Sequence, residues 1–251
     1  MQHSFEIKIG HDSALVESAD ELVAILDVLQ GQHDREVLQQ LEKDLHLLIR
    51  NSKELYKVVS ILHFEDQIYL FRILEGQLAE IIGKGSGLRD LLAFISEDEA
   101  ENALIETLGS AGIQKLITNA VELAEILEWV YGSMDQTILN YLTVASIQKI
   151  VKGGREMSLI LNALDAASQR KLIDGLGEVF IRKLIHQTED FAYLMRALPF
   201  ETSRQLVDSL DGDKIRDLIR SAEDLIYLNR YLDASEQEYL KHKLEELNYA
   251  V

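Results

Sequence analysis

Hydrophobic residues recur along the chain in one pattern, with a period of 33 to 35 residues. Each segment of the pattern opens with an acidic residue, or once a glycine, followed by a large apolar residue. The seven segments begin at Glu21, Glu54, Gly87, Glu122, Glu156, Asp190 and Asp224. A period of this length is typical of stacked helical units, because a single unit cannot bury its own apolar face.

The first part of each segment predicts an amphipathic helix of about ten residues. Large apolar residues stand one, four and eight positions after the segment start, which places them on one face of an α-helix. The positions hold Leu22/Ile25/Leu29, Leu55/Val58/Leu62, Leu88/Leu91/Ile95, Leu123/Ile126/Val130, Met157/Ile160/Leu164, Phe191/Leu194/Leu198 and Leu225/Leu228/Leu232.

Two further apolar stripes predict a second and a third helix in each segment. The second-helix pairs are Val37/Leu41, Leu70/Leu74, Leu104/Leu108, Ile138/Leu142, Leu172/Leu176, Leu206/Leu210 and Leu240/Leu244. The third-helix pairs are Leu45/Ile49, Leu78/Ile82, Ile113/Ile117, Ile147/Val151, Ile181/Ile185 and Ile215/Ile219.

The step between these two stripes divides the segments. In the first two it is four residues, from Leu41 to Leu45 and from Leu74 to Leu78, so we expect the second helix to continue unbroken. In the next four it is five residues, and one extra residue turns the stripe by about 100°. We therefore predict two-helix hairpins for the first two segments and three short helices for the later ones.

The first 20 residues follow a different pattern. Phe5, Ile7 and Ile9 alternate with polar residues, and turn-forming residues 10–13 come next. This predicts a small β-hairpin that caps the first segment, with Ser18 and Glu21 capping the helix that follows. A frayed N-terminal tail is the alternative.

The fold class that follows is all-α: an α-solenoid of about seven helical repeats of 33–35 residues. Residues 21–251 are expected to form a single helical-repeat domain behind a cap or tail at residues 1–20. In general shape the three-helix segments resemble armadillo, HEAT and Pumilio units.

One recurring pattern resembles a more specific class of protein. An acidic residue before a leucine, with Ile-x-x-Leu-Ile at residues 113–117, 181–185 and 215–219, resembles helical-repeat segments of effectors that intracellular bacterial pathogens deliver by type IV secretion. The resemblance implies a protein that acts inside a host cell after secretion. Glutamates near the C-terminus, such as Glu236, Glu238, Glu245 and Glu246, would suit such an effector, and an ordinary acidic capping helix explains them equally well.

The amino-acid composition excludes several kinds of site and disfavours one class of ligand. Of 251 residues, 47% are apolar and none is cysteine, so the chain can bury a core but cannot form disulfides or thiolate metal sites. No signal peptide and no long apolar run is apparent, which favours a cytoplasmic protein without a membrane span. The net charge of −18 disfavours nucleic-acid binding.

Candidate catalytic motifs are lacking. None of the seven histidines has a compact ligand spacing, so we expect no metal and no cofactor. Gly83, Lys84 and Gly85 superficially resemble a phosphate loop, but Leu78 stands where that motif needs a glycine, and a helix precedes the loop. We read these residues as a turn between segments and expect no enzymatic activity; an enzyme with an irregular site remains the alternative.

Two sets of surface residues are candidates for partner binding. The polar ladder repeats at two adjacent positions of the third helices and consists of Gln114, Lys115, Gln148, Lys149, Arg182, Lys183, Arg216 and Asp217. Its members in the less acidic half of the chain, Lys149, Arg182, Lys183 and Arg216, could attract an acidic peptide or an anionic head group. A solubilising polar face is the alternative.

Aromatic residues form the second set. Tyr193, Tyr227 and Tyr231 occupy related positions in the first helices of the last two segments, and they could form an exposed patch there. Tyrosine suits a binding surface because it buries a large area and tolerates water; packing between segments is the alternative. The sequence thus predicts a non-catalytic interaction scaffold with a protein partner, and a binder of an anionic ligand or nucleic acid through the ladder as the second candidate.

Overall fold

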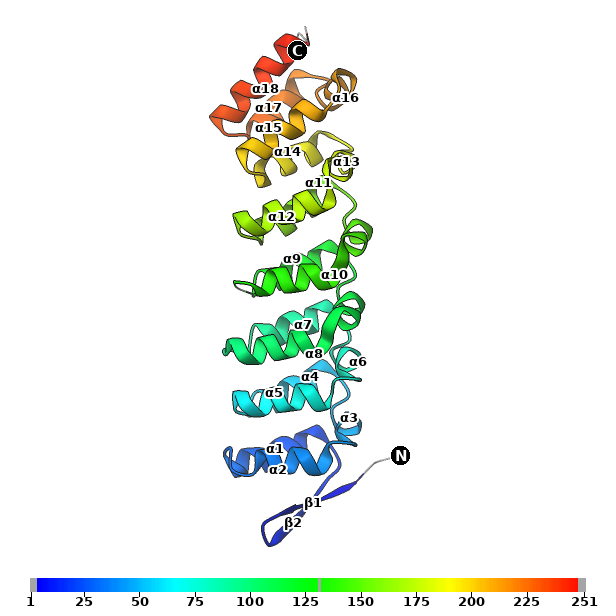
Figure 1. The fold of residues 1–251 in the computed structure, drawn as a ribbon, viewed down its shortest axis with the longest axis vertical. Helices are drawn as coiled ribbons and strands as arrows, with labels where there is room; N and C mark the ends of the chain where they lie inside the picture. Colours follow the sequence, from blue (N-terminus) through cyan, green and yellow to red (C-terminus); the bar gives the residue numbers. More distant parts are fainter. Residues whose placement is uncertain (1–3, 131, 248–251) are drawn as a thin grey trace. The chain divides into compact units, whose positions relative to one another are not determined.

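The computed structural model describes residues 4–130 and 132–247. It is 71% helical, and within the described residues it has eighteen helices and one two-stranded sheet (Figure 1). The all-α class and the N-terminal hairpin are therefore confirmed. Contacts between Cα atoms divide the chain into unit 1, Met1–Thr118 with Trp129–Tyr141, and unit 2, Asn119–Glu128 with Leu142–Val251. The expectation of a single domain over residues 21–251 stays a prediction.

Unit 1 begins with the hairpin. Strand β1 (Phe5–Ile9) pairs antiparallel with β2 (Asp12–Val16), and the Ile7 and Val16 side chains are fully buried. Gln40 of the neighbouring helix extends the sheet, because its amide accepts from the Lys8 N–H and donates to the Lys8 carbonyl, each at 2.8 Å. The hairpin thus packs on the first segment as a cap, and the Ser18 hydroxyl caps the next helix through the Glu21 N–H, as expected.

The remaining elements are helices in chain order. Unit 1 contains α1 (Ala19–Leu29), α2 (Asp34–Leu41), α3 (Leu45–Leu48), α4 (Ser52–Val59), α5 (Phe64–Ile73), α6 (Leu78–Ile82), α7 (Gly85–Leu92), α8 (Asp98–Leu116) and the first part of α10 (Met134–Ile150). Unit 2 contains α9 (Ala120–Leu127), the rest of α10, α11 (Gly154–Asn162), α12 (Ala166–Leu176), α13 (Glu178–Lys183), α14 (Thr188–Ala197), α15 (Phe200–Ser209), α16 (Gly212–Leu218), α17 (Ala222–Asn229) and α18 (Ala234–Glu246).

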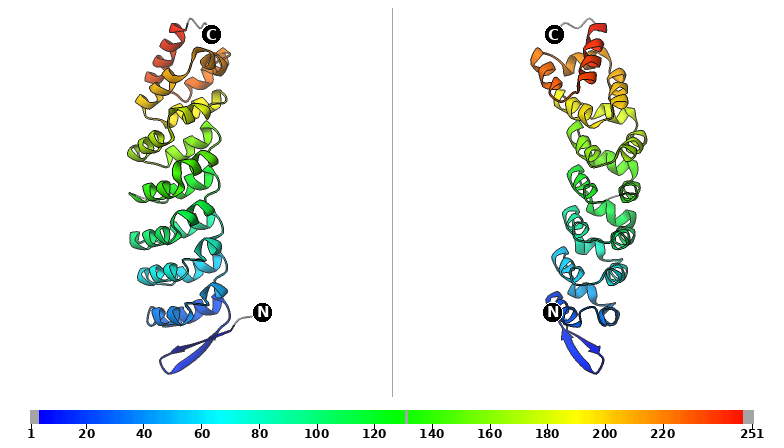
Figure 2. Two further views of the ribbon diagram at one scale, coloured as in Figure 1. Left: turned by 45° about the vertical axis from the view of Figure 1, so that its right-hand side comes forward. Right: turned by 90° about the vertical axis from the view of Figure 1, so that its left-hand side faces the viewer.

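Within each unit the helices pack on their counterparts in the next segment. In unit 1, first helix α4 contacts α1 and α7, and second helix α5 contacts α2 and α8. In unit 2, first helix α11 contacts α9 and α14, and α14 contacts α17. The right-hand view of Figure 2 shows the first and second helices of unit 1 in two separate rows. The predicted stripes face inward: Leu55, Leu88, Leu123, Met157 and Leu194 are fully buried.

The prediction of two-helix hairpins for the first two segments is wrong. Both have three helices, because a tight turn separates α2 from α3 and α5 from α6. The Asp44 N–H donates to the Leu41 carbonyl and the Gln77 N–H to the Leu74 carbonyl, both at 2.8 Å. Such three-residue hydrogen bonds tighten the end of a helix without needing a glycine, so the spacing of apolar residues could not reveal the turn.

The later segments turn by another route. Gly109 and Thr143 interrupt α8 and α10 with positive φ angles of 55° and 57°, and Gly177 separates α12 from α13 at 79°. This left-handed backbone suits glycine and is uncommon for threonine. Three of the four five-residue steps thus break the helix at a residue of positive φ, and in the fourth Leu210 and Asp211 leave the helix with extended backbone angles.

The acidic residue that opens a segment caps its own first helix. Glu54 accepts from the Arg50 N–H at 2.7 Å, and Asp224 accepts from the Arg220 and Ser221 N–H groups at 3.0 Å. Three residues earlier stand side chains that accept from N–H groups inside the helix, namely Ser18, Asn51, Asn119 and Ser221. These bonds satisfy donors that a helix start leaves free. Helix-end chemistry therefore explains the recurring carboxylates.

Asp34, at the start of α2, is an exception among the acidic residues. Its side chain is buried, and neither carboxylate oxygen has a hydrogen-bond partner in the described part of the chain. Burial raises the pKa of the Asp34 carboxyl above its ordinary value, and the nearby Asp66 carboxyl raises it further. The ionised form is therefore unfavourable in the folded state.

We expect Asp34→Asn to raise the free energy of unfolding at pH 7 by about 1 kcal/mol. The folded protein binds this proton more tightly than the unfolded chain, whose aspartates titrate near about pH 3.9. The wild type therefore gains stability as the pH falls through the raised pKa of Asp34, and this contribution is missing at pH 7. The free energies of unfolding of the two proteins should become equal at about pH 4. Urea unfolding at both pH values tests this, with the exposed Asp27→Asn as control. A variant less stable than the wild type at pH 7 would contradict it.

Candidate functional site

The polar ladder contains two columns with different roles. In the first column, the Gln114 amide donates to the Tyr141 carbonyl at 2.8 Å, and the Arg182 guanidinium donates to the Ser209 carbonyl at 3.0 Å. Each acceptor lies 27 residues further along, at the end of the second helix of the next segment. Arg216 reaches the Leu247 carbonyl at 3.4 Å. Side chains that bond the last carbonyls of a helix stabilise its end, so this column links consecutive segments.

The second column is the more exposed. Lys115 pairs with Glu80 of the preceding segment, and Asp217 lies 3.8 Å from Arg220. Lys149 and Lys183 are exposed, and neither has an ion pair or a side-chain hydrogen bond among residues 4–130 and 132–247. The positive charges of these two ladder lysines are therefore available to a partner.

The three tyrosines lie together in unit 2. The ring centroid of Tyr231 is 5.7 Å from that of Tyr193 and 5.1 Å from that of Tyr227, with tilted ring planes. The Arg155 guanidinium lies 5.8 Å from the centre of the Tyr193 ring. We call Tyr193, Tyr227 and Tyr231 the tyrosine cluster; its members come from α14, α17 and the turn after α17, as their related positions predicted.

The tyrosine cluster is partly open to solvent. Each of its rings is half-buried, and the Tyr227 and Tyr231 hydroxyls are 3.5 Å apart. This hydrogen bond, followed by burial, raises the pKa of the Tyr227 hydroxyl. Leu159 occupies the same position of α11 and is 39% exposed, and Arg196 and Arg230 are exposed at the ends of α14 and α17. The first helices of unit 2 thus present aromatic, aliphatic and guanidinium groups to solvent.

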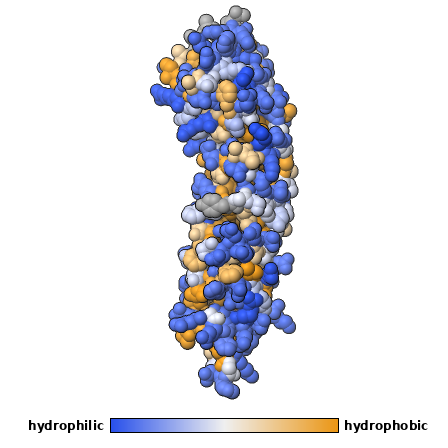
Figure 3. Space-filling model, turned by 60° about the vertical axis from the view of Figure 1, so that its left-hand side comes forward, coloured by the Kyte–Doolittle hydropathy of each residue, from blue (hydrophilic) through white to orange (hydrophobic). Residues whose placement is uncertain are grey.

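The face drawn in Figure 3 carries apolar residues in separate patches among polar ones. Among the described residues, the exposed large apolar side chains are Leu15, Val28, Tyr56, Val121, Trp129, Val144, Leu159, Val179 and Ile226. They are distributed over both units, so their number does not single out one binding surface. The tyrosine cluster differs in that one ring, Tyr231, contacts two others. A guanidinium also lies over Tyr69, Phe200 and Tyr239, so the position of Arg155 is a supporting feature.

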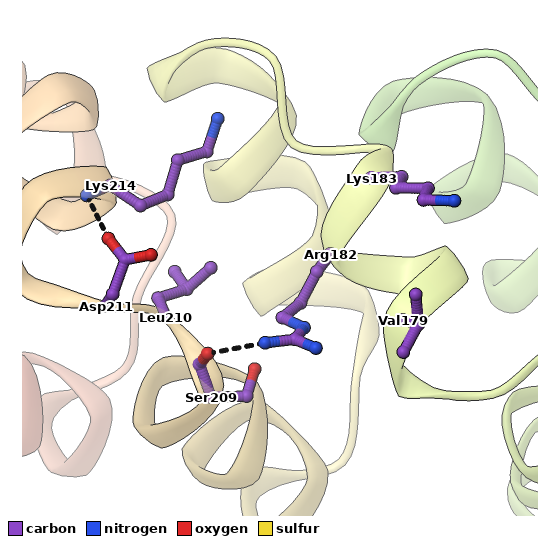
Figure 4. A pocket seen from close by; sticks show the side chains of 7 residues that line it. All are labelled: Val179, Arg182, Lys183, Ser209, Leu210, Asp211 and Lys214. Carbon is purple, nitrogen blue, oxygen red and sulfur yellow. Dashed lines mark hydrogen bonds between the residues drawn. The ribbon is translucent and has the colours of Figure 1, made fainter.

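A pocket in unit 2 brings together cations from different segments (Figure 4). It has a volume of about 270 Å³ and lies between α13 and the turn from α15 to α16. We call it the cationic pocket; its lining residues are Val179, Arg182, Lys183, Ser209, Leu210, Asp211 and Lys214. Arg182 and Lys183 are ladder residues, whereas Lys214 is new. Arg216, predicted to act with them, is not among the lining residues and pairs with Asp213 at 3.1 Å.

Unit 1 holds a larger groove of about 600 Å³ between α4 and α7. Its ionisable residues are Lys53, Tyr56, Lys57 and Asp90. Lys57 pairs with Asp20 at 2.5 Å and Asp90 with Arg89 at 2.6 Å. Tyr56 packs edge-on against Phe94, with ring centroids 4.8 Å apart. Among the described residues that line the groove, neither the Ser52 nor the Tyr56 hydroxyl has a recorded hydrogen bond to a general base.

Neither a metal-binding cluster nor a membrane-spanning helix lies within the described residues. They contain no group of three or more histidine or acidic side chains placed to hold a metal ion. No helix in the same part of the chain combines the length and the apolar character needed to cross a bilayer.

Comparison with protein-family models, with curated protein sequences and with solved structures finds no match for this chain.

Sequence reasoning missed two of the residues that matter here. Arg155 precedes Glu156 and has no counterpart in the tyrosine columns, so only the fold places it over Tyr193. Lys214 belongs to an Asp-x-x-Lys start of α16, in which the Asp211 carboxylate accepts from the Lys214 N–H at 2.7 Å. The capping aspartate could have indicated the start of α16 from the sequence. This helix start places Lys214 in the same pocket as Arg182.

Proposed function

We propose that this protein is a non-catalytic interaction scaffold: an α-solenoid that binds a protein partner through the tyrosine cluster of unit 2. The observation that carries the proposal is a set of three half-buried rings, in which the Tyr231 centroid lies 5.1 Å from that of Tyr227 and 5.7 Å from that of Tyr193. Tyrosine and arginine are enriched in the residues that contribute most to protein–protein binding. Here Arg155 stands over one ring and Arg196 and Arg230 are exposed nearby in the sequence.

The solenoid architecture is part of this proposal. It is supported by the contacts of α4 with α1 and α7 and of α11 with α9 and α14, which join like helices of successive segments. Each segment would then bury its apolar stripes against its neighbours, and like positions would form continuous columns on the surface. Such columns offer a partner several contacts in a row.

The partner we propose is a protein with an acidic surface. If the resemblance to type IV secretion effectors holds, it is a protein of the host cell, and this chain acts there after secretion. Lys149 and Lys183 have no ion pair with any residue that the structure describes. They would attract such a partner over some distance, because exposed charges mainly raise association rates. The first ladder column is less available, since Gln114 and Arg182 are bonded to backbone carbonyls.

The experiment combines capture and kinetics. Wild-type protein, Tyr227→Ala and the control Tyr56→Ala, which changes an exposed tyrosine of unit 1, are used as baits in lysates of candidate host cells. We expect one saturable partner that the wild type and the control retain and that Tyr227→Ala loses. With that partner purified, Tyr227→Ala should shorten the lifetime of the complex about 30-fold, since a central aromatic residue contributes about 2 kcal/mol.

Lys183→Glu should act differently. We expect a several-fold slower association with a weaker dependence on salt, and an almost unchanged lifetime, because a rim charge steers the encounter. Surface plasmon resonance at two salt concentrations separates the two effects. Normal binding by a folded Tyr227→Ala protein would refute the proposed surface.

A further inference from the structure

The cationic pocket has a charge balance opposite to that of the chain. Three cationic side chains line it, Arg182, Lys183 and Lys214, against the single carboxylate of Asp211. The chain as a whole carries a net charge of −18. The Asp211 carboxylate already accepts from the Lys214 N–H at 2.7 Å, so part of its hydrogen-bonding capacity serves the start of α16.

Two of the three cations have no ion pair within the part of the chain that the structure describes, and the third, Arg182, pairs with Glu178. Lys183 and Lys214 have no ion pair or side-chain hydrogen bond in the described ranges. Arg182 donates through Nη1 to the Ser209 carbonyl at 3.0 Å, and its Nε lies 3.6 Å from Glu178. The bond to Ser209 fixes the guanidinium at the pocket and leaves Nη2 without a recorded bond. A fixed guanidinium loses little freedom when it binds an anion.

Figure 4 shows how the groups are arranged. Arg182 lies in the middle of the view and points toward Ser209, and Lys214 lies on the other side of Leu210. Lys183 directs its ammonium away from Arg182, at the edge of the view. Val179 and Leu210 supply apolar surface between the charges. The Lys214 ammonium also points away from the Arg182 guanidinium (Figure 4), so Arg182, fixed by Ser209, is the group placed to hold an anion, and the two lysines supply positive charge around it.

We propose that the cationic pocket binds a phosphate monoester group. Three lining cations stand against the carboxylates of Asp211 and of Glu178, which lies 3.6 Å from the Arg182 Nε, and the positive balance of about one favours the anionic phosphate monoester. A guanidinium with further positive charge around it is suited to phosphate oxygens. The inference is independent of the tyrosine cluster and does not require a protein partner there.

The phosphate has two sources, a free small molecule or a phosphorylated side chain, and the experiment distinguishes them. The full chain is titrated with inorganic phosphate and with a phosphoserine peptide flanked by alanines, each against sodium chloride of equal ionic strength. Amide NMR signals of residues 179–183 and 209–214 report binding. We expect saturable shifts with a dissociation constant on the order of 1 mM for inorganic phosphate.

Two variants make the result specific. Lys214→Gln should weaken phosphate binding about tenfold, because it removes one of the positive charges around Arg182. Lys149→Gln changes an exposed ladder lysine outside the pocket and should leave binding unchanged. Thermal melting by circular dichroism confirms that both variants fold.

The outcomes are distinct. Tighter binding of the phosphoserine peptide than of phosphate assigns the pocket to a phosphorylated chain, and equal binding assigns it to the phosphate group alone; either supports the proposal. Shifts that sodium chloride reproduces, or an equal loss in Lys149→Gln, would overturn it. Loss of partner capture in Tyr227→Ala has no bearing on these measurements, so the two proposals fail separately.

Discussion

Gly154→Ala is expected to lower the free energy of unfolding by about 3 kcal/mol, although it adds a single methyl group. Gly154 opens α11 and lies against Asp190, near the start of α14. A Cβ atom there would stand 2.2 Å from the Asp190 carbonyl oxygen and 2.7 Å from its carbonyl carbon. These are backbone atoms, so relief requires α11 and α14 to move apart.

Hydrogen bonds also join Gly154 to the segment around Asp190, and a separation of α11 and α14 would break them. The Asp190 carboxylate accepts from the Gly154 N–H at 2.9 Å and from the His186 N–H at 3.2 Å. The Gly154 N–H also donates to the Leu184 carbonyl at 3.0 Å. Asp190 is buried, so a loss of these partners would leave a carboxylate unsatisfied.

Gly175→Ala is the matched control for Gly154→Ala. It lies within α12, where an added Cβ meets only a Val144 methyl group at 3.7 Å, an ordinary contact. Alanine is the better helix former, so this variant should be equal to or more stable than the wild type by about 0.5–1 kcal/mol. Urea unfolding followed by circular dichroism compares the two. Equal stability of the Gly154→Ala variant and the wild type would contradict the close approach of α11 and α14.

Leu176→Asp is expected to cost about 4 kcal/mol or to prevent folding, since it places an uncompensated carboxylate in the core. Leu176 ends α12 and is 5% exposed, in the second-helix stripe read from the sequence. Val179→Asp, three residues further, is the control, because Val179 is 58% exposed. Thermal melting of the two variants tests the register of the segment. A Leu176→Asp protein that melts at the wild-type temperature would show that the register is wrong.

Side-chain periodicity predicted which residues are buried, but not how segments are joined. Leu176 and Met157 could be assigned to the core because a helix face repeats in the sequence. The turn between Leu41 and Leu45 could not, because it depends on backbone hydrogen bonds that any residue type can make. For this reason the first two segments were expected to be hairpins.

The candidate sites were predicted in the same uneven way. Tyr193 and Tyr227 hold the same position of successive segments, and Tyr231 follows Tyr227 by one helical turn, so the repeat suggested one patch of the three. Arg182 was read as a free cation, whereas its partner is the carbonyl of Ser209, which no sequence pattern identifies. The contact between Gly154 and Asp190 joins residues 36 positions apart. The sequence alone does not show why Gly153 and Gly154 are glycines, because the reason is the close approach of Asp190.

The bonds between segments also bear on how the chain folds. Gln114 and Tyr141 are 27 residues apart, and Gly154 and Asp190 are 36 apart, in a chain of 251. Each such bond closes a short loop, and the entropy lost in closing a loop grows with its length. In a chain of low contact order, favourable contacts offset this entropy loss early, because each newly ordered segment packs directly on its neighbour. The separation of about one segment between partners therefore favours rapid, local nucleation over a search for distant contacts.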